Sequence, residues 1–466
     1  MVFSSPIFLF FFLPAVYLGY RALPRWARNG WLAAASIVFY AFGQLPYTLL
    51  LLASVTANYL FGRLLMGGAH RKALVGCAAA ANLLVLGAFK YLDFLVGTLD
   101  RLFGLTLPLP GIVLPIGISF YTFQGLSYVI DVYRRPEEGT KSFGKLLLYI
   151  SFFPQLIAGP IIQYHDISGQ IDRREITPAR TLTGLSRFIT GLAKKMLLAN
   201  TAGQVADGVF ALTAEALDFR LAWLGAVCYT LQIYFDFSGY SDMAIGLGKL
   251  FGFDFAENFN LPYVSRSVRE FWRRWHISLS SWFRDYLYIP LGGNRKGRAR
   301  TGIHKFIVFF ATGLWHGANW TFILWGLWHG LFVTLEDAGV IPKRLRQSVL
   351  GQAYTLLVVT LGFVIFRAET LAAGAGMLRQ MFTGFAVTHA HTLALCGLLD
   401  GWTGFLLLAG GLLSLGLPQR WAAAAGQRVS APVREGARAV WCGALLLLSM
   451  MSLASAAFNP FIYFQF

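Results

Sequence analysis

The amino-acid sequence predicts an all-α polytopic membrane protein with about 11–12 transmembrane helices. The composition of the chain and its recurring apolar runs support this fold class. Hydrophobic residues fill 56% of the 466 positions, charged residues fill only 13%, and the mean hydropathy is +0.57. Soluble globular proteins carry about 25% charged residues, so this chain has roughly half the usual share. Apolar runs long enough to cross a bilayer recur along the chain, which indicates that lipid solvates most of its surface.

The predicted spans follow one another from the N-terminus. The first, near 6–22, has no positively charged segment before it and no small-residue cleavage site after it, which predicts a retained helix and not a signal peptide. Further spans are predicted near 30–43, 46–64, 73–92, 112–130, 187–211, 221–250, 303–318, 320–336, 350–366, 402–416 and 438–457. Because no internal repeat or soluble domain boundary interrupts them, we expect one membrane-embedded domain over 1–466.

The positively charged residues predict the orientation. Clusters of Arg and Lys follow the first, third and fifth predicted spans, so these alternate loops are expected in the cytoplasm and the N-terminus outside. The segment Ser265–Lys305 carries only Glu270 and Asp285 as acids against ten cations: Arg266, Arg269, Arg273, Arg274, Arg284, Arg295, Lys296, Arg298, Arg300 and Lys305. This placement between apolar segments accounts for the net charge of +17 without a nucleic-acid partner.

The segment 146–162 is not predicted to cross the membrane. The segment 146–162 has cations on both sides and contains Pro154, Gly159 and Pro160, which predicts a re-entrant or in-plane segment that protein or a water-filled cavity must cover.

The four cysteines are scattered beside apolar runs without a CxxC or Cys/His spacing. They predict small buried side chains, with neither a disulfide framework nor a metal site.

The segment Val268–Tyr286 is predicted to form one amphipathic helix. Aromatic and aliphatic residues recur at spacings of three and four on one face, and arginines occupy the other. Such a helix is expected in the plane of the membrane interface, with its cations among the headgroups. His276 shares the aromatic face, so we expect its side chain to point toward the interior. On spacing alone, a structural imidazole and a functional one are equally open readings.

The next two predicted spans carry the motifs ATGLWHGANW and TFILWGLWHG. An ionisable side chain inside an apolar helix is costly, so His316 and His329 are candidates for a functional site. Asn319 follows His316 by three residues and is expected on the same helical face, where it can orient the imidazole or hold a substrate oxygen. Spacing does not choose between the two histidines, and a pair with only packing roles remains an alternative. Close helix approach is predicted at Gly313, Gly317, Gly326 and Gly330.

Other polar residues also fall within predicted spans. Ser119, Thr122, Gln124 and Ser127 predict a helix that faces the interior of the bundle or a cavity. Asp236 and Asp242 lie in the motif YFDFSGYSDMAIG, in or near another span. Buried acids of this kind occur in ion pathways, and they also pair structurally with arginine or tyrosine, so both readings stay open.

Taken together, these motifs resemble the membrane-bound O-acyltransferase family. The resemblance is carried by LPIGISFYTFQGLSYVIDVYR, FFPQLIAGPI, YFDFSGYSDMAIGLGKLFGF, ENFNLPY, FWRRWHISLSSWFRDYLYIPLGGNRKG and GLWHGANWTFILWGLWHG. The resemblance runs from the N-terminus to about Arg367, and it implies a characteristic core of the domain at about 110–335. Within the family, the chain is similar to the bacterial alginate O-acetyltransferase branch, whose relatives modify peptidoglycan, cellulose or teichoic acid. The resemblance implies helices around a central funnel or tunnel in a multi-pass protein of the bacterial inner membrane.

The resemblance also implies the reaction and its residues. His316 matches the invariant histidine of the family's LWHG motif, and His276 matches the second histidine of this branch, whereas His329 lies outside the matched positions. The family moves an acyl group from a thioester to a hydroxyl, and an imidazole can pass the proton between them. We expect acetyl-CoA or another acyl thioester as donor substrate, no bound cofactor or metal, and substrate contacts from Asn319, Trp315, Trp275, Arg273 and Arg274.

The expected partners are an exported polysaccharide such as alginate, membrane lipid and a soluble periplasmic acetyltransferase that receives the acyl group. The sequence does not choose the acceptor polymer, the identity of the donor or the oligomeric state. An ion-coupled transporter that uses Asp236, Asp242 and the histidines as a relay is a rival reading, although such proteins often show paired repeats that are not detected here. A non-catalytic membrane scaffold is a second rival, and it would need neither histidine.

Overall fold

A computed structural model describes the whole chain except residues 69, 296, 427–428, 456–460 and 463–466. Lys296 of the cationic segment and the end of the predicted span 438–457 therefore lie outside the described residues. Every regular element in the described part is helical, as the sequence predicts. The chain packs as two compact units, one formed by Met1–Phe188 with Ser241–Glu257 and the other by Ile189–Tyr240 with Asn258–Phe466. The single domain over 1–466 stays a prediction.

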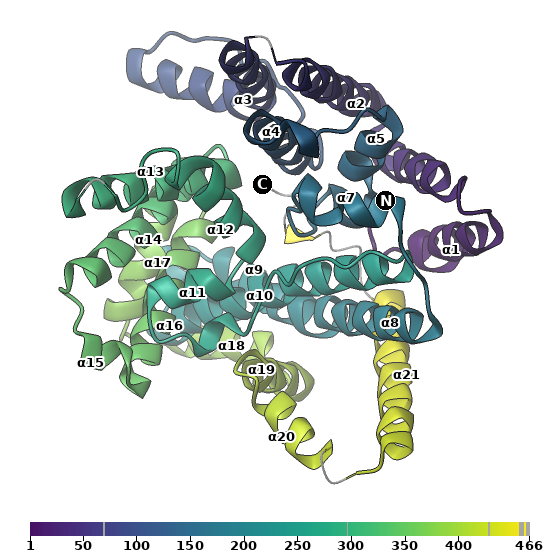
Figure 1. The fold of residues 1–466 in the computed structure, drawn as a ribbon. Coiled ribbons are helices and arrows are strands. Elements are labelled where there is room, and N and C mark those ends of the chain that lie inside the picture. The colour runs from purple at the N-terminus through teal and green to yellow at the C-terminus, as the bar shows by residue number, and fades with distance from the viewer. Residues whose placement is uncertain (69, 296, 427–428, 456–460, 463–466) are drawn as a thin grey trace. The chain divides into compact units, whose positions relative to one another are not determined.

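In the first unit, α2 (Arg28–Met66) packs against α3 (Arg71–Phe103), α4 (Ile118–Arg134) and α5 (Phe143–Ser151) (Figure 1). α2 contains both of the predicted spans 30–43 and 46–64. They are separated at Gln44, whose φ of −145° and ψ of 41° are not helical, just before Pro46. Proline lacks the amide hydrogen that a continuous helix needs, so the break falls where the sequence places it. The unit also contains η1 (Phe8–Phe12), α1 (Leu13–Ala22), η2 (Pro136–Glu138), α6 (Phe153–Leu156) and α7 (Tyr164–Asp172).

The polar helix α4 faces the interior of this unit, as its sequence predicts. Gln124 and Ser127 are fully buried, and Thr122 and Ser119 are nearly so. The Ser119 hydroxyl accepts a hydrogen bond of 3.2 Å from the buried Lys90 ammonium of α3. The segment 146–162 forms only α5 and α6, which are nine and four residues long. Nine helical residues rise about 14 Å, so neither helix can cross a bilayer, which agrees with the prediction for this segment.

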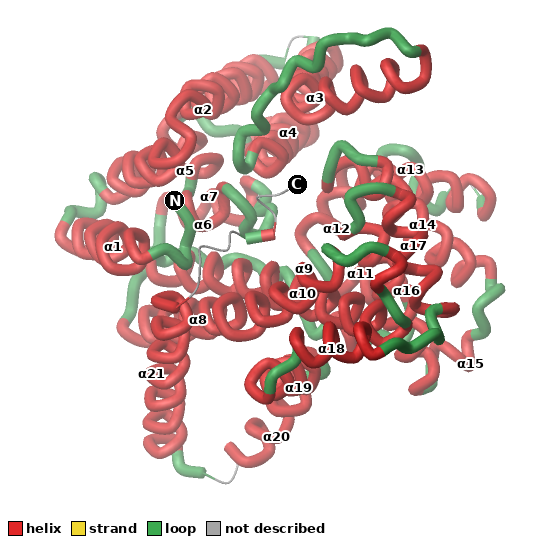
Figure 2. The backbone as a smooth tube through the Cα atoms, turned by 180° about the vertical axis from the view of Figure 1, so that it is seen from behind, coloured by secondary structure: helices red, strands yellow, loops and turns green. Residues whose placement is uncertain are grey.

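The second unit holds the predicted histidines. α13 (Arg298–His316) and α14 (Trp320–Ala338) form an antiparallel hairpin, and α14 also packs against α11 (Val268–Arg274) and α16 (Val349–Arg367) (Figure 2). Its remaining elements are η3 (Lys194–Ala199), α9 (Asn200–Phe210), η4 (Ala214–Ala216), η5 (Pro262–Val264), α12 (Ile277–Phe283), η6 (Arg284–Tyr288), α15 (Lys343–Arg346), α17 (Leu371–Thr383), α18 (His389–Leu398), α19 (Gly401–Ser414), α20 (Leu417–Gly426) and α21 (Ala431–Ser455). α8 (Pro178–Ala193) and α10 (Phe219–Leu250) contribute residues to both units.

Four described helices are long and apolar enough to cross a membrane: α2, α3, α16 and α21. The bent pair α18 and α19 adds a fifth if the two are counted as one span. Several other predicted spans carry buried polar side chains, such as Asp236 in α10 and His329 in α14, which lower their hydropathy. The structure therefore supports a polytopic membrane protein, and the total of about 11–12 spans stays a prediction.

Candidate active site

The hairpin of α13 and α14 positions His316. The backbone of Gly313 lies against the carbonyl group of Phe322, and that of Gly326 lies against the carbonyl oxygen of Phe309. A Cβ at either glycine would press on that backbone, so only glycine permits this approach, as the small-residue pattern predicts. α13 ends at His316 because Gly317 adopts an extended conformation.

Asn319 does not share a helical face with His316, so that prediction is wrong. α13 has already ended at His316, and Asn319 instead begins α14 as its N-cap. Its side-chain oxygen accepts a hydrogen bond of 3.2 Å from the Thr321 amide. Its side-chain nitrogen donates one of 2.9 Å to the Glu369 carbonyl. Both polar atoms of Asn319 therefore stabilise the turn, and a cap of this kind contributes about 1 kcal/mol.

His316 lies among aromatic rings. It is 4% exposed, and its ring centroid lies 5.0 Å from Trp315, 4.9 Å from Trp325 and 5.3 Å from Phe366. All three rings meet the imidazole close to edge-on. The surroundings are apolar, so a charge formed on a substrate here would be screened far less than in water.

The predicted continuous helix over Val268–Tyr286 is wrong, because the helix is interrupted at Trp275 and His276. α11 ends at Arg274, Trp275 is extended, and His276 has φ 43° and ψ 55° before α12 begins. A left-handed backbone is uncommon for a residue with a side chain and costs of order 1 kcal/mol or more. Surrounding interactions must therefore hold this corner.

Asn258 holds the corner at His276. Its backbone carbonyl accepts a hydrogen bond of 3.0 Å from the Ile277 amide. Its side-chain oxygen accepts from the Ser278 amide at 3.1 Å and from the Ser278 hydroxyl at 2.9 Å. The amides at the start of α12 lack helical partners, so Asn258 satisfies two of them. No sequence signal singles out Asn258, which lies within the motif ENFNLPY.

The same asparagine fixes the tautomer of His276. Nδ1 of His276 lies 3.3 Å from the Asn258 side-chain oxygen. That oxygen already accepts from the Ser278 amide, which can only donate, so the oxygen faces this group and Nδ1 must carry the hydrogen. Burial lowers the pKa of His276 to about 3. The ring is therefore neutral near pH 7, and Nε2 holds the lone pair that can accept a proton or a hydrogen bond.

Trp315 joins the two predicted catalytic histidines. Its ring centroid lies 5.9 Å from that of His276 and 5.0 Å from that of His316. His329 belongs to the same cluster, because its ring lies 5.2 Å from Trp325, which also contacts His316. His329 is fully buried, and neither ring nitrogen has a hydrogen-bond partner in the described part of the chain. Three imidazoles thus share one aromatic cluster, with His276 and His316 on a common indole.

The other predicted substrate contacts lie in different surroundings. Trp275 is buried and stacks on Phe271 with centroids 5.4 Å apart. Arg273 is exposed. Arg274 donates to the Glu270 carboxylate at 2.9 Å and to the Asn260 carbonyl at 3.1 Å. Trp275 therefore belongs to the aromatic core, whereas the two arginines lie outside it.

The acids of α10 form ion pairs. Asp236 lies 2.5 Å from the ammonium of Lys195, and both side chains are almost fully buried in the second unit. Asp242, in the first unit, lies 2.6 Å from the guanidinium of Arg187. Of the two readings left open by the sequence, these contacts favour structural pairing. The sequence does not predict Lys195 as the partner of Asp236, because the two residues lie far apart in the chain.

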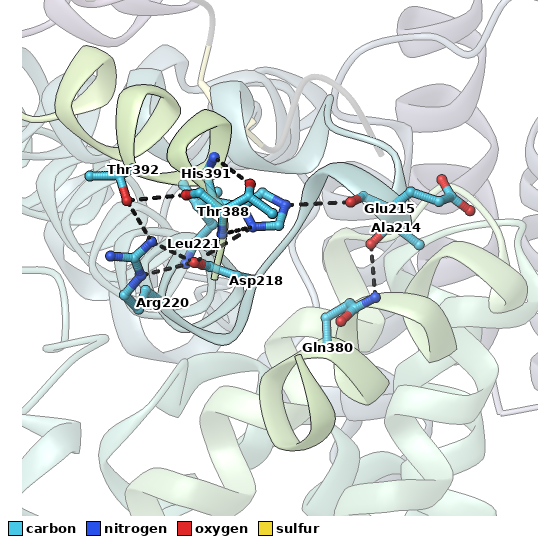
Figure 3. Close-up of polar contacts among 9 residues, drawn as sticks. All are labelled: Ala214, Glu215, Asp218, Arg220, Leu221, Gln380, Thr388, His391 and Thr392. Atoms are coloured by element: carbon cyan, nitrogen blue, oxygen red, sulfur yellow. Dashed lines mark hydrogen bonds and ion pairs between the residues drawn. The ribbon is translucent and has the colours of Figure 1, made fainter. Parts of the chain in front are cut away.

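Figure 3 shows a separate polar cluster in the second unit, at the start of α10. The buried Asp218 carboxylate accepts from the Leu221 amide at 2.9 Å and from the Arg220 guanidinium at 2.8 Å. Arg220 also donates to the Thr392 hydroxyl at 3.1 Å, and His391 caps α18 through Thr388. These contacts tie α18 to α10. None of them includes a residue of the imidazole cluster.

Residues 135–341 match the model of the MBOAT, membrane-bound O-acyltransferase family, a range that contains all three clustered histidines. The chain is 42% identical to a protein of Pseudomonas putida named probable alginate O-acetylase AlgI, and the similarity covers 100% of both chains. A protein of the same name from Azotobacter vinelandii is 41% identical, again over 100% of both. A peptidoglycan O-acetyltransferase of Helicobacter pylori is 35% identical, covering 84% of this chain and 81% of that protein.

Proposed function

This chain belongs to the membrane-bound O-acyltransferase family, and we propose that it acetylates an exported polysaccharide such as alginate, with His316 as the proton acceptor. The family and the relatives support an O-acyltransferase. The observation that carries the assignment of residues is that His316 and His276 lie against one indole, Trp315. Acetylation of peptidoglycan or cellulose and transfer of D-alanine use the same chemistry, and they remain alternatives for the acceptor and the acyl group.

The proposed reaction joins a hydroxyl to a thioester. As the hydroxyl oxygen attacks the thioester carbonyl carbon, the neutral imidazole of His316 takes the hydroxyl proton. The tetrahedral intermediate then expels the thiolate, which receives that proton, so an ester and a thiol are formed. In this proposal His276 assists, because its Nε2 is the acceptor nitrogen of a neutral ring. It can bind a hydroxyl hydrogen and orient the acceptor.

The other predicted contacts enter this proposal with different roles. Trp315 lies against both imidazoles and would pack on the acyl group. Trp275 would shape the wall of the site from the aromatic core. Arg273 and Arg274 would face the donor rather than the reacting atoms. Asn319 would act on substrate only through the turn that it caps, since both its polar atoms are already bonded.

The location of the site fits a reaction that links two compartments. By the positive-inside rule, the cationic segment Ser265–Lys305 predicts that one end of α13 lies in the cytoplasm. An acyl thioester such as acetyl-CoA would approach from that side of the inner membrane. The acyl group would leave toward the periplasm, either onto the polymer or through a soluble periplasmic acetyltransferase.

An ion-coupled transporter is the alternative from another class. It would need Asp236 and Asp242 as carriers of protons or ions. Each instead pairs with a cation, Asp236 with Lys195 and Asp242 with Arg187. A buried acid held in this way is expected to support the fold, so these contacts favour the enzyme.

Replacing His316 tests the proposed function. His316→Ala protein should insert and accumulate, because alanine enters a membrane helix more easily than histidine. Acyl transfer should fall by a factor of about 10² to 10⁴, the usual cost of a lost general base. His276→Ala should reduce acyl transfer by the same factor or a smaller one, and His329→Ala should reduce it least. The measurement is the acyl content of the exported polymer, with protein levels followed by immunoblot. A His316→Ala protein at normal levels with the parental rate would contradict the assignment.

A further inference from the structure

A cavity of about 610 Å³ lies beside α11 in the second unit. Its wall includes Arg266, Glu270 and Arg274 from the segment at α11, Arg346 from the end of α15, and Arg420 from α20. Leu415 and Leu417 add an apolar part to the same wall. We propose that this cavity binds a phosphate group carried by an amphiphilic or nucleotide-bearing ligand.

The charges in the cavity are not balanced by protein acids. Four arginines line it against one carboxylate, and Arg274 uses that carboxylate at 2.9 Å. Arg266, Arg346 and Arg420 have no ion-pair partner in the part of the chain that the structure describes. Arg346 also buries its Nε atom without a hydrogen-bond partner there. A buried donor atom without an acceptor costs free energy, so the Nε atom of Arg346 indicates that an acceptor is missing.

A phosphate is the acceptor that suits these groups. Guanidinium groups present planar, forked donors that match the oxygens of phosphate in pairs. The three arginines come from segments around 266, 346 and 420, so folding and not a local run of charge brings them to one cavity. The positive-inside rule explains why cations lie at this end of the unit, but it does not require them to converge.

The cavity lies along the helix that leads to the imidazole cluster. Glu270 and Arg274 lie four residues apart on α11, and Arg266 lies two residues before the helix begins. Trp272 of the same helix faces His329 with ring centroids 5.3 Å apart. Arg274 precedes His276 by two residues. If the ligand is the acyl donor, an assignment that rests on the proposed function, its phosphate would bind beside Arg346 and its thioester arm would run along α11 toward His276. A phospholipid headgroup is the other source of the same chemistry.

Binding can be tested without catalysis on the purified full chain in detergent. The first probe is coenzyme A, measured by calorimetry, and the second is thermal stabilisation by phosphatidylglycerol relative to phosphatidylcholine. For whichever of the two probes binds the parental protein, Arg346→Gln should weaken binding about tenfold or more, as expected for a lost charge-assisted hydrogen bond. Arg346→Lys should fall between, because it keeps the charge and loses the fork. Arg344→Gln is the matched control on the same short helix, exposed and outside the cavity, and it should bind like the parent.

Each outcome decides the proposal. A loss with coenzyme A supports a donor phosphate, and a loss with phosphatidylglycerol alone supports a lipid headgroup. Equal behaviour of Arg346→Gln and Arg344→Gln with both probes overturns the site. If Arg346→Gln does not fold, Arg420→Gln, at an exposed position on the same wall, replaces it. Because these assays need no transfer, a protein that binds in an Arg346-dependent way but never acylates would refute the proposed function and leave the phosphate site intact.

Discussion

The two predicted catalytic histidines are held in different ways. His316 stands at the end of a hairpin fixed by close backbone packing, with Gly313 and Gly326 where α13 and α14 meet. His276 stands at a corner of unfavourable backbone geometry that Asn258 fixes by hydrogen bonds. The hairpin has no room for an added side-chain atom at Gly313 or Gly326. The corner at His276 depends on the side-chain oxygen of Asn258 as a hydrogen-bond acceptor. The two histidines can therefore be disturbed separately, His316 by a larger residue in the hairpin and His276 by loss of the Asn258 side chain.

The largest expected effect comes from bulk in the hairpin. Gly326→Ala would place a Cβ against the Phe309 carbonyl and force the two helices apart. Overpacking of this kind costs about 1 to 3 kcal/mol or more, and it also displaces His316. We expect reduced thermal stability and strongly reduced acyl transfer, measured on purified protein.

Gly302→Ala is the matched control for that experiment. It lies on α13, and its nearest neighbour would be the Thr334 side chain at 3.6 Å, an ordinary contact. Stability and transfer should stay close to the parental values. Equal losses in the two variants would show that the close approach at Gly326 does not fix the hairpin.

A smaller effect is expected when the corner loses its acceptor. Asn258→Ala removes the side-chain oxygen that binds His276 and Ser278, so the imidazole is no longer held in one orientation. Misplacing a reacting group by about 1 Å can cost up to 100-fold in rate, and we expect a loss of about 10- to 100-fold. Asn260→Ala is the control, since Asn260 is exposed and contributes its backbone atoms to this region. Parental transfer by a normally folded Asn258→Ala protein would exclude the positioning role.

A substitution at Gly362 tests whether His329 is a catalytic group or a packing residue. A Cβ at Gly362 of α16 would lie 3.0 Å from Nε2 of His329, so Gly362→Ala shifts that imidazole by a few tenths of an ångström. If His329 has a packing role, stability should fall by about 1 kcal/mol while transfer by the folded protein stays near the parental rate. A selective loss of transfer at unchanged stability would instead add His329 to the catalytic groups.

The smallest effect concerns accessibility. In a background without the native cysteines, Arg273→Cys should react readily with an aqueous maleimide, because that position is exposed. His276→Cys should be protected, because the position is fully buried. Equal labelling at the two positions would contradict the burial of the corner.

The difference between hairpin and corner also explains how far the sequence could predict the site. Helical periodicity and the glycine spacing predicted α13, α14 and their close approach, because both signals lie within a few neighbouring residues. The break at His276 depends on Asn258, eighteen residues earlier, while the apolar spacing of 268–286 continues through it. Periodicity therefore predicted one helix where the structure has two. The Lys195–Asp236 pair escaped prediction for the same reason, since its partners come from different helices.

The pH dependence of acyl transfer by the purified enzyme, from about pH 5 to pH 9, tests whether the imidazole of His316 accepts the hydroxyl proton. A base must be unprotonated, so the parental rate should fall when the pH becomes low enough to protonate the base. His276, with its pKa lowered to about 3, stays neutral throughout and cannot supply this decrease. We predict that the residual rate of His316→Ala loses the decrease at low pH, whereas His329→Ala keeps it. The same decrease in His316→Ala would contradict the claim.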